Sequence, residues 1–260
     1  MSEHVRRDDV DGVCVVTIDR PERRNALSYA MLDAIAGHVR DAGTDPAVRA
    51  VVLTGVPGQF CAGTDLTELH DVEPGTDPRD RTQHTDGRHW FLHDCPKPTI
   101  AAIDGPAAGL GVELATMCDF RIASQRARFS WIFVQRGLVP DTGAGTWLLP
   151  RLVGPQVAKR LVYSGAFVDA DHAREIGFVL DVVPPDRLEA TALDLAREVS
   201  GGSPFALSRA KALIDAAAGR GREEHLVHHV TAMTECQLSD DHREGVAAFL
   251  QKRPATFTGM

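Results

Sequence analysis

A glycine-rich segment from Gly105 to Asp119 contains the residues best suited to chemistry. A predicted strand ends at Asp104, and small residues then turn the chain into an apolar helix. The first amides of a helix lack partners within it and lie at its positive end, so they can stabilise a negatively charged oxygen. Glu113 interrupts the apolar face one turn into this helix. Burial would raise the pKa of its carboxyl and suit it to acid and base catalysis. The structural alternatives are that Glu113 forms an ion pair with an arginine or caps its own helix.

Two further turns could take part in the same chemistry. The apolar segment 50–55 leads through Gly63 to another helix start, and two such turns side by side could direct two amides at one oxygen. The alternative is an ordinary turn without a function. In the segment 136–150, Asp141 follows a proline and precedes Thr142, so it offers either a second carboxylate or a helix N-cap.

The elements that position these turns follow from the hydrophobic pattern of the first half of the chain. Ser28 predicts the cap of an amphipathic helix that runs to about Asp41. Apolar strands separated by helices favour an α/β fold with a mainly parallel sheet. The polar segment 71–86, rich in Pro, Gly, Asp and Thr, predicts a surface loop. The predicted strands are 13–18, 49–53, 99–103 and 120–123.

The second half of the chain has a different pattern, with successive amphipathic helices. Pro155 and Asp169 each predict a helix start, and the glycines at 165 and 177 predict the corresponding ends. We therefore predict two units, an α/β core over 1–200 and a helical region over 201–260. Further helices are predicted over 186–200, 204–218 and 223–238.

Composition excludes several classes of protein. The 260 residues carry a net charge of −8, which disfavours binding to nucleic acid. We find no run of about 18 apolar residues without a charge and no apolar run at the N-terminus, so we expect neither a membrane span nor a signal peptide. Five cysteines without a Cys-x-x-Cys motif indicate free thiols in the cytoplasm rather than disulfides or a zinc site.

Metal and dinucleotide sites are also disfavoured by the sequence. His89 and His93 lie four residues apart, but no third ligand accompanies them, so we predict no metal. The glycines between Gly105 and Gly111 do not have the Gly-x-Gly-x-x-Gly spacing of a dinucleotide site. We expect no cofactor.

Motifs along nearly the whole chain resemble those of the crotonase superfamily, the enoyl-CoA hydratases and isomerases. They comprise 19–27, 60–66, 98–105 with the glycine turn, 137–141 and 241–253. The resemblance implies a spiral of ββα repeats with C-terminal helices that form trimers, which often pair into hexamers. It also implies acyl-CoA thioesters as substrates, with coenzyme A as part of the substrate rather than a cofactor.

The resemblance assigns roles to four residues. The amides of Thr64 and Leu110 would hold the thioester carbonyl and stabilise an enolate. The family usually has glycine where this chain has Leu110, so we expect a narrower acyl pocket. Glu113 matches the first of the two glutamates of family hydratases, whereas Phe133 occupies the position of the second. Asp141 matches an acidic position that some family isomerases use for proton transfer.

The same resemblance implies a binding site for coenzyme A, for which solvated surface charges are the structural alternative. Arginines beside phosphates make physical sense. The matching residues are Arg23, Arg24, Ala26, Ala62, Asp65, Leu66, Phe249 and Lys252. Of these, Phe249 and Lys252 match C-terminal positions that reach the coenzyme A of a neighbouring subunit.

Three hypotheses for function follow. Because Asp141 is present and Phe133 replaces the second glutamate, we favour double-bond isomerisation of an enoyl-CoA by Glu113 and Asp141. The first alternative is a hydratase that adds water to a trans-2-enoyl-CoA with Glu113 as its main acid and base. The second alternative is a homologue that binds acyl-CoA without catalysis.

Overall fold

The apolar segments predicted as strands form the centre of a six-stranded sheet. The computed structural model describes residues 3–68 and 89–259. The strand order is β1-β2-β3-β4-β6-β9, in which β1 pairs antiparallel with β2 and all other pairs are parallel. The mainly parallel α/β fold is therefore confirmed. The strands are β1 (Val5–Val10), β2 (Val13–Ile18), β3 (Ala50–Gly55), β4 (Thr99–Ile103), β6 (Phe120–Ser124) and β9 (Asp181–Val183).

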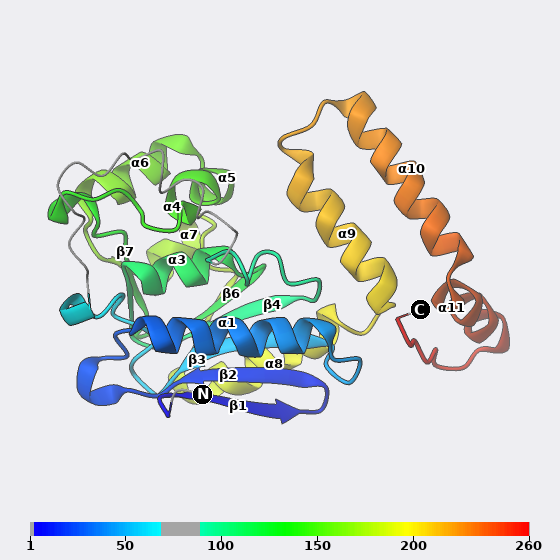
Figure 1. The fold of residues 1–260 in the computed structure, drawn as a ribbon, viewed down its shortest axis with the longest axis horizontal. Coiled ribbons are helices and arrows are strands. Elements are labelled where there is room, and N and C mark those ends of the chain that lie inside the picture. The colour runs from blue at the N-terminus through cyan, green and yellow to red at the C-terminus, as the bar shows by residue number, and fades with distance from the viewer. Residues whose placement is uncertain (1–2, 69–88, 260) are drawn as a thin grey trace.

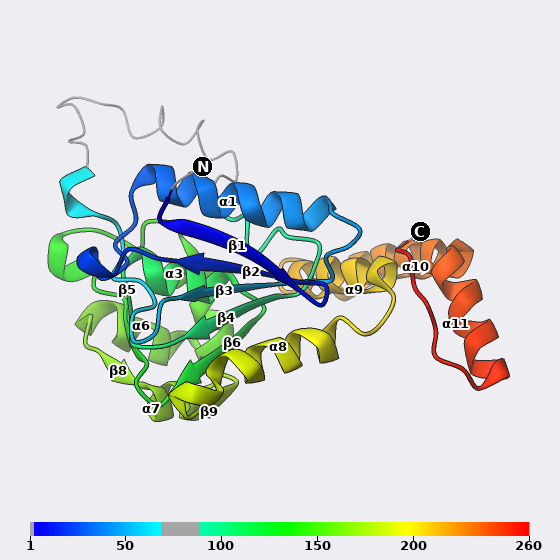
Figure 2. The same ribbon diagram turned by 90° about the horizontal axis from the view of Figure 1, so that it is seen from below.

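Helices cover both faces of this sheet (Figures 1 and 2). Helix α1 (Tyr29–Thr44) lies on one face and α8 (Leu188–Val199) on the other. Ser28 caps α1 as predicted, since its side chain accepts a hydrogen bond from the amide of Met31 at 3.1 Å. Apolar side chains of β2, β3, β4 and β6 pack against Leu188 and Ala192 of α8, and a larger core fills the opposite face.

A second, three-stranded sheet lies beside the glycine-rich turn and carries the helix that follows it. This sheet consists of β5 (Pro106–Ala108), β7 (Arg128–Ser130) and β8 (Val168–Asp169). Helix α3 (Leu110–Met117) follows β5 directly, and all eight of its residues are buried. The segment with the candidate catalytic glutamate is therefore part of the protein interior.

The remaining helices confirm most of the predicted starts and ends. Asp169 caps α7 through the amide of His172 at 2.9 Å, and α6 runs from Pro155 to Ser164 as predicted. These helices are α4 (Ala144–Trp147), α5 (Leu149–Val153), α6 (Pro155–Ser164) and α7 (Ala170–Glu175). The 3-10 helices are η1 (Pro21–Arg23), η2 (Leu66–Glu68), η3 (Val134–Arg136) and η4 (Pro185–Arg187).

The last three helices lie together to one side of the sheet (Figure 1). They are α9 (Pro204–Ala217), α10 (Arg222–Leu238) and α11 (Asp240–Gln251). The Arg49 guanidinium donates hydrogen bonds to the carbonyls of Ser200 and Gly202, which fixes the start of this helical region against the core. In the part of the chain that the structure describes, no helix is long and apolar enough to span a membrane. The predicted loop over 71–86 lies outside the described residues.

Candidate active site

The two predicted turns lie next to each other because their backbones are paired. The Cys61 amide donates to the Pro106 carbonyl, and the Ala108 amide donates to the Cys61 carbonyl, both at 3.0 Å. Gly63 has φ +108°, and a Cβ atom there would lie 3.4 Å from the Leu110 nitrogen and 2.9 Å from the Ala108 carbonyl oxygen. Only glycine fits this close approach without strain. The two turns thus lie side by side, which the interpretation of two amides directed at one oxygen requires.

The amides of Thr64 and Leu110 have no protein acceptor among the described residues. Leu110 is the first residue of α3, so its amide precedes the hydrogen-bonding pattern of the helix. The neighbouring Gly109 amide, by contrast, donates to the Ser130 carbonyl at 3.1 Å. The Leu110 amide lies at the start of a buried helix, and Thr64 follows Gly63, whose added Cβ would lie 3.4 Å from the Leu110 nitrogen. Amides in such positions can donate to an oxygen that develops negative charge.

Glu113 is completely buried, and its two carboxylate oxygens have different environments. Oε2 accepts hydrogen bonds from the Thr142 hydroxyl at 2.7 Å and from the Gly145 amide at 3.1 Å. Oε1 has no hydrogen-bond partner among the described residues. Desolvation by burial raises the pKa of this carboxyl to about 7, against the opposing effect of the two hydrogen bonds, and the charge of Asp141 raises it further.

Neither structural alternative for Glu113 is found among the described residues. There its carboxylate pairs with no arginine, and the N-cap of α3 is Gly109. A buried carboxyl with a pKa near neutrality can both take and give a proton at physiological pH, as a general acid and base must.

Asp141 immediately precedes the residue that holds Glu113, so the structure places both carboxyls in one region. The side chain of Asp141 is exposed at the surface, yet surrounding protein atoms reduce its hydration and raise its pKa to about 6. Asp141 is not a helix cap, because α4 begins after Gly143. The N-cap alternative is therefore wrong.

Phe133, which the family resemblance matches to the second glutamate of hydratases, is a buried residue just before η3. Trp131, two residues earlier, is fully buried and stacks edge-on against Phe178 with ring centroids 5.0 Å apart. The buried side chains at these two positions are therefore aromatic and offer no carboxylate to hold a water molecule.

The predicted coenzyme A residues of the N-terminal half lie at one edge of the molecule. Arg23 and Arg24 are exposed around η1, and the Ala62 amide donates to the Arg24 carbonyl at 3.1 Å. Ala62 and Leu66 are exposed and Ala26 is half-buried. Exposed guanidinium groups and free surface beside the two turns are what a phosphate-bearing ligand requires.

Asp65 differs from the other predicted contacts because its carboxylate is occupied within the protein. It accepts hydrogen bonds from the Thr67 hydroxyl at 2.7 Å, the Thr67 amide and the Arg20 guanidinium. These donors hold the pKa of Asp65 below its usual range. Its side chain thus holds the two loops together, and its backbone amide donates to the Leu27 carbonyl at 2.8 Å.

Sequence reasoning missed Arg20 and Asn25 as organisers of this edge. The Arg20 guanidinium also donates to the Ala26 carbonyl at 3.1 Å. Asn25 is fully buried at φ +56°, and its side-chain amide donates to the carbonyls of Ile18, Gln59 and Phe60. Asparagine tolerates this left-handed conformation and bonds to nearby backbone, so its position in a turn after a strand was the available signal.

Phe249 and Lys252 are not brought to this site within one chain. Phe249 lies on α11 and is 83% exposed, and Lys252 follows the same helix at φ +53°. Their predicted contact with coenzyme A would have to come from a second copy of the chain.

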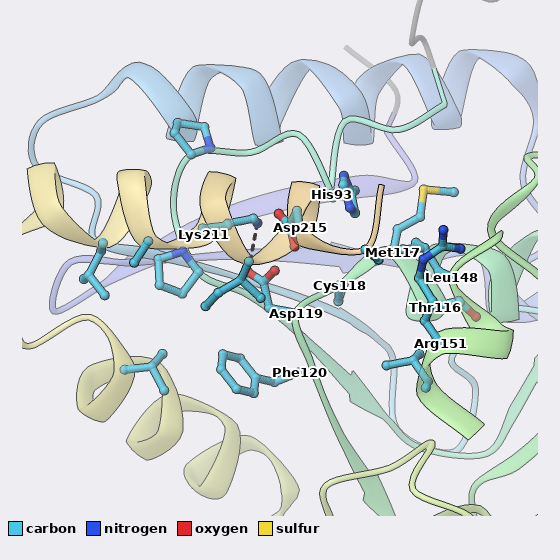
Figure 3. Close-up of a pocket in the computed structure, with 18 of the residues that line it drawn as sticks. His93, Thr116, Met117, Cys118, Asp119, Phe120, Leu148, Arg151, Lys211 and Asp215 are labelled. Atoms are coloured by element: carbon cyan, nitrogen blue, oxygen red, sulfur yellow. Dashed lines mark hydrogen bonds and ion pairs between the residues drawn. The ribbon is translucent and has the colours of Figure 1, made fainter. Parts of the chain in front are cut away.

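A cavity of about 770 Å³ between α9 and the C-terminal end of α3 is separate from this cluster (Figure 3). Lys211 of α9 forms an ion pair with Asp119 across it at 2.9 Å. None of the four predicted catalytic residues lines this cavity. Among the described residues, no group of three His, Cys, Asp or Glu side chains could hold a metal ion.

Comparisons with known proteins identify the family of this chain. The model of the family "Enoyl-CoA hydratase/isomerase" matches residues 8–260. The chain is 37% identical over 253 residues to 1,2-epoxyphenylacetyl-CoA isomerase of Escherichia coli and 35% identical over 247 residues to 2,3-dehydroadipyl-CoA hydratase of the same organism, with 95% of each chain covered. An enoyl-CoA hydratase structure from Bacillus anthracis superposes with a TM-score of 0.88 at 31% identity, covering 99% of this chain and 100% of that one. The chain belongs to the enoyl-CoA hydratase/isomerase family of the crotonase superfamily and is an enzyme of that family.

Proposed function

We propose that this enzyme moves the double bond of an enoyl-CoA thioester. The observation that carries the proposal is the pair of carboxyls, Glu113 with a pKa of about 7 and Asp141 with a pKa of about 6, combined with the apolar Phe133 at the position of the second glutamate. Two groups that exchange protons near neutral pH suit the relocation of a proton along a carbon chain.

In the proposed mechanism the Thr64 and Leu110 amides bind the thioester carbonyl oxygen. Ionised Glu113 removes a proton from Cα of a 3-enoyl thioester, and the electron pair spreads over the carbonyl oxygen and the former double bond. Protonated Asp141 then delivers a proton to Cγ, which gives the 2-enoyl thioester. The substrate and product have the same composition. After the step Glu113 carries the extra proton and Asp141 lacks one, and proton exchange with solvent returns both carboxyls to their starting states. The amides bind the negative oxygen more strongly than the neutral carbonyl, and this difference accelerates the step.

The coenzyme A part of the substrate is proposed to lie along the edge formed by segments 23–26 and 62–66. Exposed Arg23 and Arg24 there provide guanidinium groups for phosphate, and the edge is contiguous with the two amides through the bonds of Ala62 and Cys61. We propose no cofactor other than this part of the substrate.

Water addition to a 2-enoyl thioester is the second candidate function. The similarity to the hydratase of Escherichia coli is nearly as high as that to the isomerase. Glu113 alone would then activate water and protonate Cα. Binding without catalysis is disfavoured because burying the Glu113 carboxyl with one oxygen unpaired lowers the stability of the fold. A protein that only binds acyl-CoA gains nothing from this loss of stability.

Product analysis distinguishes these functions. The purified protein is incubated with matched 2-enoyl and 3-enoyl thioesters of several chain lengths, and the products are identified by mass spectrometry and chromatography. We expect conversion of the 3-enoyl to the 2-enoyl thioester without change of mass, faster than any gain of one water by the 2-enoyl substrate. Faster gain of water would support the hydratase instead, and tight binding without turnover would support the non-catalytic homologue.

We also propose that the helical region joins copies of the chain into a trimer or a pair of trimers. Helix α10 has no buried residue, and its apolar side chains Val227, Val230 and Met233 are more than half exposed. A large exposed apolar surface of this kind is typical of an interface. Because all five cysteines are free thiols, we further propose a cytoplasmic location, which cell fractionation would check.

A charge placed on α10 should disrupt this assembly. Wild type is expected to have three or six times the 28.1 kDa mass of the chain by light scattering, whereas Val230→Glu should give smaller species because it would bury a charge. Val230→Leu preserves the apolar surface and should assemble like wild type. A monomeric wild type at micromolar concentration would contradict the proposal.

A further inference from the structure

The geometry points to Thr142 as the positioning residue of Glu113: its hydroxyl fixes Oε2 as an acceptor, so that Oε1 is the oxygen that exchanges the proton. This inference rests on the proposed function of Glu113 as an acid and base. It goes beyond that function because it assigns the two oxygens of the carboxylate different tasks and names the residue that separates them.

The direction of the Thr142 hydrogen bond follows from its neighbours. The Ala144 amide donates to the Thr142 hydroxyl oxygen at 3.2 Å, so one lone pair of that oxygen is already used. Its single proton is directed at Oε2 of Glu113, 2.7 Å away. A hydroxyl has one proton to donate. The pair of bonds thus defines Thr142 as an acceptor from the backbone and a donor to the carboxylate.

Oε2 is occupied by protein donors and Oε1 is not. The Gly145 amide is the second donor to Oε2, at 3.1 Å. Oε1 is buried without a partner among the described residues. A proton on Oε2 would displace one of its two donors, whereas a proton on Oε1 leaves both bonds in place. When the carboxyl is protonated, its proton therefore lies on Oε1, and Oε1 is the oxygen that takes up and releases it.

The backbone of Thr142 is itself held from the other side. The Trp90 indole N–H donates to the Thr142 carbonyl at 2.9 Å, and Trp90 packs edge-on against Trp147 with ring centroids 5.6 Å apart. Gly145 completes the arrangement, because a Cβ there would lie 2.5 Å from Oε1 of Glu113 and 2.9 Å from Trp131. The loop thus places one hydroxyl and one amide on the carboxylate and leaves room for its second oxygen.

The hydrogen bond from Thr142 changes the pKa of Glu113 in a definite direction. A donor to the ionised carboxylate stabilises the charged form, so the Thr142 hydroxyl lowers the pKa of Glu113. Asp141 is the charged group that acts on Glu113 among the described residues, and its charge raises the same pKa. Removing the hydroxyl should therefore raise the pKa of Glu113 above its present value of about 7.

The test compares Thr142→Val, which removes the hydroxyl from a side chain of similar shape, with Thr142→Ser, which keeps it. Thr146→Val is the matched control, since it removes a nearby exposed hydroxyl that bonds to the Gly143 carbonyl and not to Glu113. Trp90→Phe tests the support of the Thr142 backbone. Two readouts are needed: the pH dependence of kcat on enoyl thioesters, and the carboxyl stretch of Glu113 in infrared titrations, isolated by subtracting the Glu113→Gln variant.

Thr142→Val should raise the pKa of Glu113 by about one unit in the infrared titration and shift the acidic limb of the kcat profile by the same amount. Thr142→Ser and Thr146→Val should titrate like wild type, and Trp90→Phe should give a smaller rise than Thr142→Val. An unchanged titration in a folded Thr142→Val variant overturns the positioning role. The infrared readout needs no turnover, so a shifted titration supports the positioning role even if the enzyme converts none of the thioesters. A lack of conversion would overturn only the proposed function.

Discussion

Replacing Glu113 with glutamine is expected to lower the turnover of enoyl thioesters by a factor between about 10² and 10⁴, the usual contribution of a general acid or base. The glutamine side chain has the same shape, and its carbonyl oxygen can still accept from the Thr142 hydroxyl and the Gly145 amide. It can no longer take up a proton, so the loss should appear in kcat, with little change in thioester binding.

The pH dependence of the wild type provides a second signature of Glu113. Burial raises its pKa to about 7, so a step that needs the ionised form should gain rate as the pH rises through this value and lose it below. The residual activity of Glu113→Gln should lack this limb. Turnover of Glu113→Gln within threefold of wild type, with circular dichroism confirming the fold of both, would contradict a catalytic role.

Replacing Asp141 with asparagine is expected to lower isomerisation of a 3-enoyl thioester by about 10²-fold, because the proton donor to Cγ is lost. Any hydration of a 2-enoyl thioester should change by much less, since that reaction would depend on Glu113. The two rates are measured on the same enzyme preparation by separating the products. Glu113 should also become slightly easier to ionise, because the charge of Asp141 raises its pKa.

The control for Asp141 is Asp171→Asn, which neutralises an exposed carboxylate in the first turn of α7. It should leave both rates unchanged. Isomerisation that survives in Asp141→Asn would remove this residue from the mechanism and leave Glu113 to move the proton alone.

The strands that position the site could be predicted because their environment is simple. Segments 13–18 and 99–103 are buried on both faces, so a continuous run of apolar residues identifies them without further information. Strand β1 escaped prediction because it is an edge strand with the charged sequence from Arg6 to Asp9, and it is held by its hairpin with β2 rather than by burial. N-cap residues in the sequence also located the starts of two helices, at Ser28 and Asp169.

The site could be predicted where a local motif or the family resemblance identified its residues. A carboxylate one turn into a buried glycine-rich helix indicated Glu113, and family resemblance indicated Asp141 and the two amides. The residues that organise the site act over long sequence separations: Thr142 reaches Glu113 across 29 residues, and Trp90 reaches Thr142 across 52. Such pairs depend on which loops the fold brings together, and neither residue type nor spacing reveals them.

The most direct test of the central claim is a crystal structure of the protein with a non-reactive enoyl-CoA thioester analogue. We expect its carbonyl oxygen about 2.7–3.1 Å from both the Thr64 and the Leu110 nitrogens, with Cα next to Oε1 of Glu113. A carbonyl oxygen bound elsewhere, or in contact with only one of the two amides, would contradict enolate stabilisation at this site.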